Sequence, residues 1–185
     1  AVSMAWFIVG IVGLIAIAPF VREWFRAPVS AARGDDDGGY AQLSDGTTYY
    51  RWFGAPTSHV IVVIHGLTTP HWVFSGLVRG LNLLGYQVLA YDLYGRGFSD
   101  RAKGEQDSAF FIRQLDDLLE DQGVTGEITL IGYSMGGAIV AAFCAEQAGR
   151  VRQLVLLAPA GLGHDLGPVA DMAVKYDFFG RWMMR

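Results

Sequence analysis

The sequence ITLIGYSMGG, residues 128–137, decides the fold of this chain. Its first four residues form an apolar, β-branched run, which is typical of a strand buried on both faces. The alanine-rich residues 138–148 favour a helix. Between them lies Gly132-x-Ser134-x-Gly136, a sharp turn in which small flanking residues let a strained serine present its hydroxyl. The turn also places Ser134 at a helix start, where free backbone N–H groups can stabilise a developing oxyanion.

Two further segments end in glycine-containing turns. Residues 59–64 form a continuous apolar strand that ends in His65-Gly66-Leu67. An oxyanion hole needs a second N–H group from the loop after an earlier strand, and this loop can supply it at Leu67. Residues 87–91 form another strand, which is followed by the turn DLYGRGFSD at residues 92–100.

In this order and spacing, the three segments resemble the α/β-hydrolase superfamily. The resemblance covers residues 40–162 and is nearest to the serine esterase, lipase and monoacylglycerol-lipase-like branches, because Ser134 holds the nucleophile position. Epoxide hydrolases and haloalkane dehalogenases of this fold carry aspartate there and are disfavoured. The resemblance implies a catalytic Ser134, an oxyanion hole formed by the N–H groups of Leu67 and Met135, and supporting motif residues His65, Gly66, Gly132 and Gly136.

Strands and helices alternate along residues 40–162. Residues 40–43 and 47–53 flank Ser44-Asp45-Gly46, which predicts a hairpin at the sheet edge. Helices are expected at residues 73–84 and 107–122, and a sixth strand at 151–157. The pattern predicts an α/β fold, a mostly parallel sheet with helices on both faces. About six of the eight strands of an α/β-hydrolase would then be present.

The N-terminal residues 1–26 are expected to anchor the chain in a membrane. Residues 4–21 carry no charge and are just long enough to span a bilayer. Arg22, Arg26 and Arg33 follow, which predicts that the catalytic domain is cytoplasmic. A signal peptide, for which a basic start is absent, and a buried core helix are the alternatives.

The remaining segments flank the predicted hydrolase core. Residues 27–39, with Asp35-Asp36-Asp37, are interpreted as a polar linker whose carboxylates are solvated. Residues 163–185 are rich in methionine and aromatic residues and occupy the place where a cap or lid begins in the family. Their apolar side chains would suit a lipid-like acyl chain, or would pack on the body or the membrane.

A serine nucleophile needs a base and an acid that orients the base. In the family both follow the serine, after later strands. His59, His65 and His71 precede Ser134, and only His164, beside Asp165, follows it, at the cap entrance and therefore too early. The chain is thus expected to be truncated before the triad acid and histidine, which would lie beyond residue 185, and to be weakly active at best alone.

The predicted function is a serine hydrolase that cleaves small or lipid-like carboxylic esters. The strand-to-helix turn that carries Ser134, called the elbow below, also serves acyltransferases, thioesterases, C–C bond hydrolases and cofactor-free haloperoxidases. A non-catalytic remnant is a third possibility. A net charge of −4 with 14 Lys and Arg residues argues against nucleic-acid binding. Metal-ligand spacings and a phosphate loop are absent from the sequence, so neither a metal nor another cofactor is expected.

Overall fold

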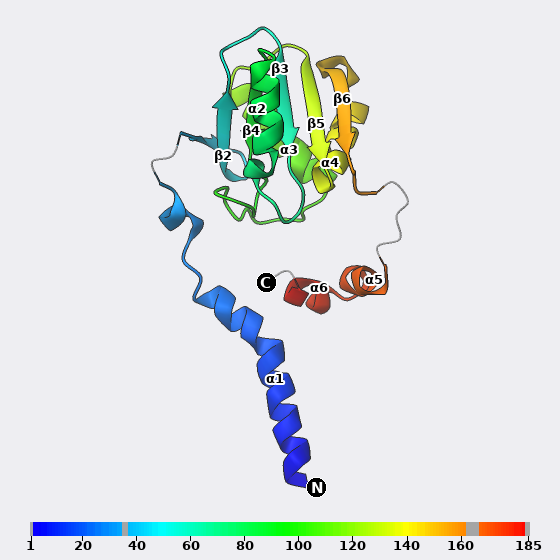
Figure 1. Ribbon diagram of the computed structural model, residues 1–185. Coiled ribbons are helices and arrows are strands. Elements are labelled where there is room, and N and C mark those ends of the chain that lie inside the picture. Colours follow the sequence, from blue (N-terminus) through cyan, green and yellow to red (C-terminus); the bar gives the residue numbers. More distant parts are fainter. Residues whose placement is uncertain (1, 35–36, 162–166, 184–185) are drawn as a thin grey trace. The chain divides into compact units, whose positions relative to one another are not determined.

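The computed structural model describes residues 2–34, 37–161 and 167–183 (Figure 1). The chain divides into two compact units. The larger unit is Val29–Leu162 and contains the sheet. The smaller unit combines Ala1–Pro28 with Gly163–Arg185 and is helical.

The larger unit is built on a six-stranded sheet with the order β1-β2-β4-β3-β5-β6. The strands are β1 (Gly39–Leu43), β2 (Gly46–Phe53), β3 (Val60–Ile64), β4 (Gln87–Tyr91), β5 (Ile128–Tyr133) and β6 (Val151–Leu157). β2 pairs antiparallel with β1 and with β4, whereas β4, β3, β5 and β6 run parallel. The predicted mostly parallel sheet with a hairpin at one edge is confirmed.

Helices cover both faces of this sheet, also as predicted. α3 (Ser108–Asp121) and α4 (Met135–Glu146) share one core with Val62 and Ile64 of β3. α2 (Ser75–Leu83) shares a second core with Ile61 and Val63, the alternate residues of the same strand. Both faces of β3 are therefore buried, which explains its uninterrupted apolar sequence. Short 3₁₀ helices are η1 (Val29–Ala32), η2 (His71–Phe74) and η3 (Ala148–Arg150).

The segment before β1 is attached to the sheet unit through Arg33. Its guanidinium donates to the Asp100 carboxylate at 2.8 Å and to the Phe98 carbonyl at 3.1 Å. The segment interpreted as a polar linker, residues 27–39, thus contains η1 and a side chain that holds it to the turn after β4. Asp35 and Asp36 lie outside the described residues.

The smaller unit consists of α1 (Val2–Trp24), α5 (Gly167–Lys175) and α6 (Asp177–Met183). Within α1, the 21-residue stretch Met4–Trp24 contains an 18-residue window with a mean hydropathy of 2.4, so it is long and apolar enough to cross a membrane. α6 packs on α1, because Phe178 stacks on Phe20 at 5.5 Å between ring centroids and Trp182 Nε1 donates to the Ile15 carbonyl. The segment interpreted as the start of a cap therefore contacts the helix interpreted as an anchor.

Candidate active site

Ser134 lies at a strained turn between β5 and α4. Its φ of 52° and ψ of −116° fall in a region that residues with a side chain rarely adopt. The flanking glycines make this turn possible: a Cβ atom on Gly136 would collide with the carbonyl oxygen of Ile64, and one on Gly132 with that of Gly136. Close approach of main chain to main chain thus excludes any side chain at positions 132 and 136, two residues before and after the serine.

The main chain of Ser134 is held by hydrogen bonds, whereas its hydroxyl is not. The N–H group donates to the Leu157 carbonyl at 3.0 Å, and the carbonyl accepts from the N–H of Ala160 at 2.9 Å. Among the described residues, none forms a hydrogen bond with the hydroxyl, and the side chain is half-buried. The hydroxyl is therefore available to react, and its position is set by the backbone.

The two predicted oxyanion donors come from separate elements beside this serine. Met135 is the first residue of α4, so its N–H group has no partner within the helix. Leu67 lies in the loop after β3. In the described part of the chain, the N–H groups of Met135 and Leu67 donate to no residue. A Cβ atom on Gly66 would lie 3.2 Å from the Cβ of Ser134, so this loop passes directly against the elbow.

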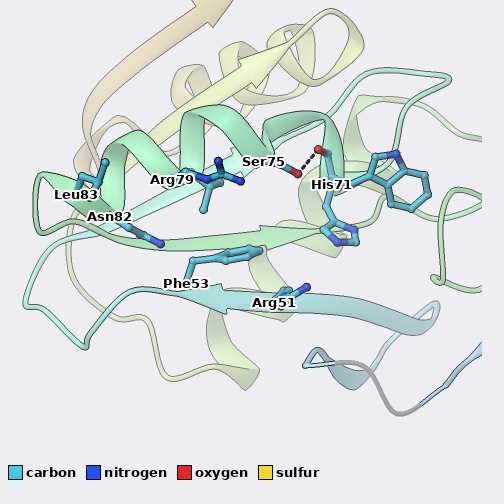
Figure 2. A pocket seen from close by; sticks show the side chains of 9 residues that line it. Arg51, Phe53, His71, Ser75, Arg79, Asn82 and Leu83 are labelled. Carbon is cyan, nitrogen blue, oxygen red and sulfur yellow. Dashed lines mark hydrogen bonds between the residues drawn. The ribbon is translucent and has the colours of Figure 1, made fainter.

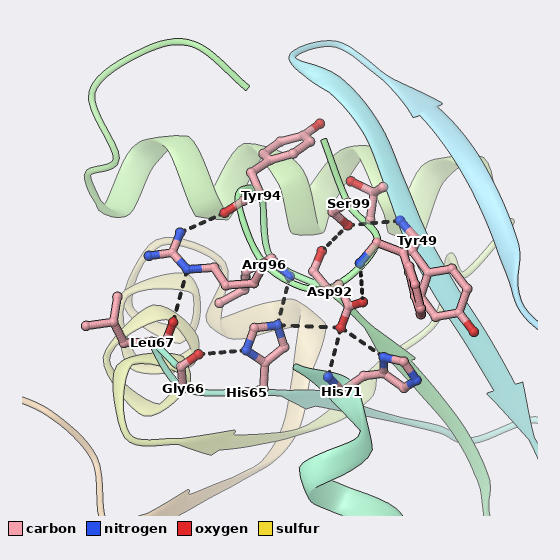
Figure 3. Close-up of polar contacts among 12 residues, drawn as sticks. Tyr49, His65, Gly66, Leu67, His71, Asp92, Tyr94, Arg96 and Ser99 are labelled. Atoms are coloured by element: carbon pink, nitrogen blue, oxygen red, sulfur yellow. Dashed lines mark hydrogen bonds and ion pairs between the residues drawn. The ribbon is translucent and has the colours of Figure 1, made fainter. Parts of the chain in front are cut away.

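His65 is fully buried and holds the loop from within (Figure 3). Its Nε2 accepts the backbone N–H of Leu93 at 2.9 Å, and its Nδ1 lies 2.7 Å from the Gly66 carbonyl oxygen. An amide only donates and a carbonyl only accepts, so the proton is on Nδ1 and the ring is neutral. Burial lowers the pKa of His65 to about 4, which agrees with this assignment.

The hydrogen bond from His65 fixes the direction of the Gly66–Leu67 peptide. In a trans peptide the C=O and N–H groups point to opposite sides. Because the Gly66 carbonyl is drawn toward the His65 ring, the N–H of Leu67 is turned away from that ring. His65 thus sets the direction of the Leu67 N–H group.

Asp92 holds the neighbouring turn together. Its buried carboxylate accepts from the N–H and Nδ1 of His71, at 2.8 and 2.9 Å, and from the N–H of Phe98 at 3.0 Å. The His65 ring lies 3.9 Å away, but it is neutral and forms no ion pair. A Cβ atom on Gly97 would collide with this carboxylate, which explains the glycine there.

Arg96 is the second side chain, after His65, that holds the loop after β3. Its guanidinium donates to the carbonyl oxygens of Leu67 at 3.3 Å and Tyr94 at 2.7 Å, and to the Gln106 side chain at 2.7 Å (Figure 3). The group also lies over the Phe111 ring, at 5.6 Å from its centroid. Burial lowers the pKa of Arg96, but a guanidinium still carries its charge at neutral pH. Leu67 is therefore held at its carbonyl, and this contact does not involve its N–H group.

Among the described histidines, none is hydrogen-bonded to Ser134. His65 and His71 are engaged as above, and His59 Nε2 bonds to Thr129 Oγ1 at 2.9 Å. That contact lies where β3 and β5 begin, whereas Ser134 follows the end of β5. His164 lies outside the described residues. Within the described residues, groups of three or more His, Cys, Asp or Glu side chains that could hold a metal ion are also absent.

Sequence reasoning brought Ser134, Leu67, Met135, His65 and Gly66 to one region, and the structure places them there. It did not anticipate the contact between Arg96 and Leu67, or the pairing of His71 with Asp92. Both depend on the path of the turn after β4 past the loop after β3. The only feature of the sequence that relates the two segments is that one follows β3 and the other follows β4, which are neighbouring parallel strands.

Comparisons with known proteins identify the family of this chain. A family model described as alpha/beta hydrolase fold matches residues 59–183. A relative named phospholipase YtpA, from Bacillus subtilis, is 31% identical over 121 residues, which cover 63% of this chain and 46% of the relative. A 2-hydroxy-6-oxo-6-(2'-aminophenyl)hexa-2,4-dienoic acid hydrolase from Metapseudomonas resinovorans is 32% identical over 93 residues, which cover 50% of this chain and 32% of that protein.

The chain also matches solved structures of the same fold. The monoacylglycerol lipase of Paleococcus ferrophilus superimposes with a TM-score of 0.61 at 26% identity, covering 72% of this chain and 51% of that one. The chain spans about half the length of the phospholipase and about a third of the length of the dienoic acid hydrolase.

Proposed function

The chain belongs to the α/β-hydrolase fold family, and from this premise we propose that it is a serine hydrolase that cleaves carboxylic esters, including lipid-like ones, with Ser134 as nucleophile. The observation that carries the proposal is the strained backbone of Ser134, φ 52°, with a hydroxyl and two neighbouring N–H groups that bond to none of the described residues. A strained serine at this strand-to-helix turn is costly for folding and is explained by a need to expose the hydroxyl.

In the proposed reaction, the Ser134 oxygen attacks the ester carbonyl carbon while a base takes the hydroxyl proton. The negative charge that develops on the carbonyl oxygen is stabilised by the N–H groups of Met135 and Leu67. Collapse of this intermediate expels the alcohol, which takes the proton from the base, and leaves an acyl group on Ser134. Attack by water then releases the carboxylate and restores the serine.

The names of two similar proteins favour ester substrates. A phospholipase and a monoacylglycerol lipase both act on esters of lipids, and their names support a lipid-like substrate here. The second candidate is hydrolysis of a C–C bond, which the 32% identity to a dienoic acid hydrolase favours. Both candidates use the same elbow, so the products distinguish them.

Labelling with a fluorophosphonate tests the nucleophile directly. We expect the probe to label this protein in membranes of cells that express its gene, and Ser134→Ala to abolish the label. Ser108→Ala, an exposed serine at the start of α3, is the matched control and should leave labelling unchanged. Equal labelling of Ser134→Ala and the parent would remove Ser134 from the mechanism.

We also propose that α1 anchors the protein in a membrane, with the hydrolase unit on the cytoplasmic side. The support is its apolar length over Met4–Trp24 and the arginines that follow. After alkaline carbonate extraction, we expect the chain to stay in the membrane pellet with residues 1–26 still attached. Recovery of a soluble protein that lacks these residues would instead identify a cleaved signal peptide.

A further inference from the structure

A concave site lies between β2 and α2, and Ser134, Leu67 and Met135 are not among its lining residues (Figure 2). Its volume is about 430 Å³, within the range of small-molecule sites. Arg51 and Phe53 line it from β2, and Arg79 and Asn82 from α2. All of it lies within the Val29–Leu162 unit.

The charge of this pocket is opposite to that of the chain. The protein has 18 acidic and 14 basic residues, yet the pocket lining contains two arginines and neither an aspartate nor a glutamate. Arg79 is exposed and forms no ion pair with any residue that the structure describes. Arg51 pairs with Asp37 at 2.7 Å, but the Asp37 side chain is 88% exposed, and such a pair is too weak to compete strongly with a ligand.

Asn82 adds a further donor to the pocket. The amide nitrogen of Asn82 faces the pocket in Figure 2, whereas its carbonyl oxygen is buried. His71 closes one end, where its Nδ1 donates to the buried Asp92. Two guanidinium groups and an amide N–H₂ in one pocket match the oxygens of a carboxylate or a phosphate.

Part of the pocket is apolar. The Phe53 ring lies under the Arg51 guanidinium at 5.0 Å, and Trp72 and Leu83 line the pocket although 53% and 84% of their surfaces remain exposed. Exposed aromatic and aliphatic side chains beside cationic groups provide a surface for the apolar part of a ligand.

We propose that this pocket binds an organic anion, a carboxylate or phosphate that carries an apolar or aromatic body. Arg51 and Arg79 bind the charged head, the Asn82 amide donates to it, and the body lies against Phe53 and Trp72. The site is independent of the chemistry at Ser134, so it exists whether or not the proposed hydrolysis is correct.

Calorimetric titration of the full chain in a non-ionic detergent tests this proposal with phenyl phosphate, benzoate, inorganic phosphate and phenol. We expect phenyl phosphate or benzoate to bind one to one, with the tighter of the two identifying the head group. The double variant Arg51→Gln/Arg79→Gln should weaken that binding at least tenfold. Arg101→Gln/Arg152→Gln removes the same charge from exposed positions outside the pocket and should change it less than twofold.

Ser134→Ala should bind as tightly as the parent, which separates this site from the proposed hydrolase activity. Unchanged melting temperatures of the two double variants show that each one is folded. Equal binding of phenyl phosphate by the Arg51/Arg79 and Arg101/Arg152 variants would overturn the proposal. Binding of phenol as tight as that of phenyl phosphate, or of inorganic phosphate as tight as both, would overturn it as well.

Discussion

The two backbone groups proposed to face the oxyanion are held in different ways. Met135 follows a turn whose shape is set by main-chain packing, because a Cβ atom does not fit between Gly136 and the Ile64 carbonyl. Leu67 lies in a loop whose carbonyl groups are held by two side chains, His65 and Arg96. A change at the elbow should therefore impair folding, whereas a change at the loop should impair reactivity more than folding.

The largest effect is expected for Gly136→Ala. The new Cβ would overlap the Ile64 carbonyl, and both Gly136 of α4 and Ile64 of β3 are buried, so the free energy of unfolding should fall by about 3 kcal/mol or more. Gly76→Ala is the matched control, since Gly76 is also the second residue of its helix but has open space around it. It should raise stability by up to about 1 kcal/mol.

Urea unfolding of both variants in detergent measures this difference. Similar stabilities of Gly136→Ala and Gly76→Ala would show that the elbow can relax. The proposed contrast between a rigid turn and a side-chain-held loop would then be wrong.

The next effect concerns the protonation of His65. Burial lowers its folded pKa to about 4, against an ordinary value near 6.5. Between these two values the unfolded chain binds a proton that the folded protein does not, so stability is complete above pH 6.5 and falls as the pH drops toward 4. The expected loss is about 3 kcal/mol, and it stops growing below pH 4.

Urea unfolding between pH 7 and pH 4 measures this loss. Carboxylates titrate in the same range, so the comparison is with His65→Gln, which carries no titrating group at this position. The stability difference between the two proteins should shrink as the pH falls. A constant difference would mean that the folded His65 titrates like an ordinary histidine.

The core of this fold was predictable because its signals are local. A buried parallel strand needs an unbroken apolar run, and a strained serine turn needs glycine two residues before and after the serine. For this reason β3, β5 and the elbow could be predicted from consecutive residues. The strand order was not predicted, because it depends on pairing between segments that are far apart in the sequence.

The contacts that hold the loop could not be predicted in the same way. Arg96 reaches the Leu67 carbonyl across 29 positions of sequence, and His71 reaches Asp92 across 21. An arginine in a turn is more often solvated than bonded to a distant carbonyl, so local composition does not predict this contact of Arg96. Such contacts depend on how two turns pass each other, which is set only after the strands pair.

A pair of variants at His65 separates the two roles of its ring. An asparagine amide can replace Nδ1–H and still donate to the Gly66 carbonyl, whereas a glutamine amide reaches the place of Nε2 and accepts from Leu93. We expect His65→Gln to slow fluorophosphonate labelling of Ser134 by about 10- to 100-fold, since the Leu67 donor loses its orientation. His65→Asn should keep labelling within about fivefold of the parent. The reverse order of the two variants would show that the bond to Leu93, and with it the fold around the loop, determines reactivity.

The smallest effect is expected for Arg96→Gln. Its bond to the Leu67 carbonyl is long, at 3.3 Å, and partly exposed, so it supports a loop that His65 already orients. Labelling should slow by about two- to fivefold, which corresponds to less than about 1 kcal/mol of transition-state stabilisation. Arg113→Gln is the matched control, because Arg113 also lies over a phenylalanine ring but bonds to Asp45, away from Leu67. If both variants label at the parent rate, His65 alone holds the loop; if Arg96→Gln is as slow as His65→Gln, the loop is held equally from its two sides.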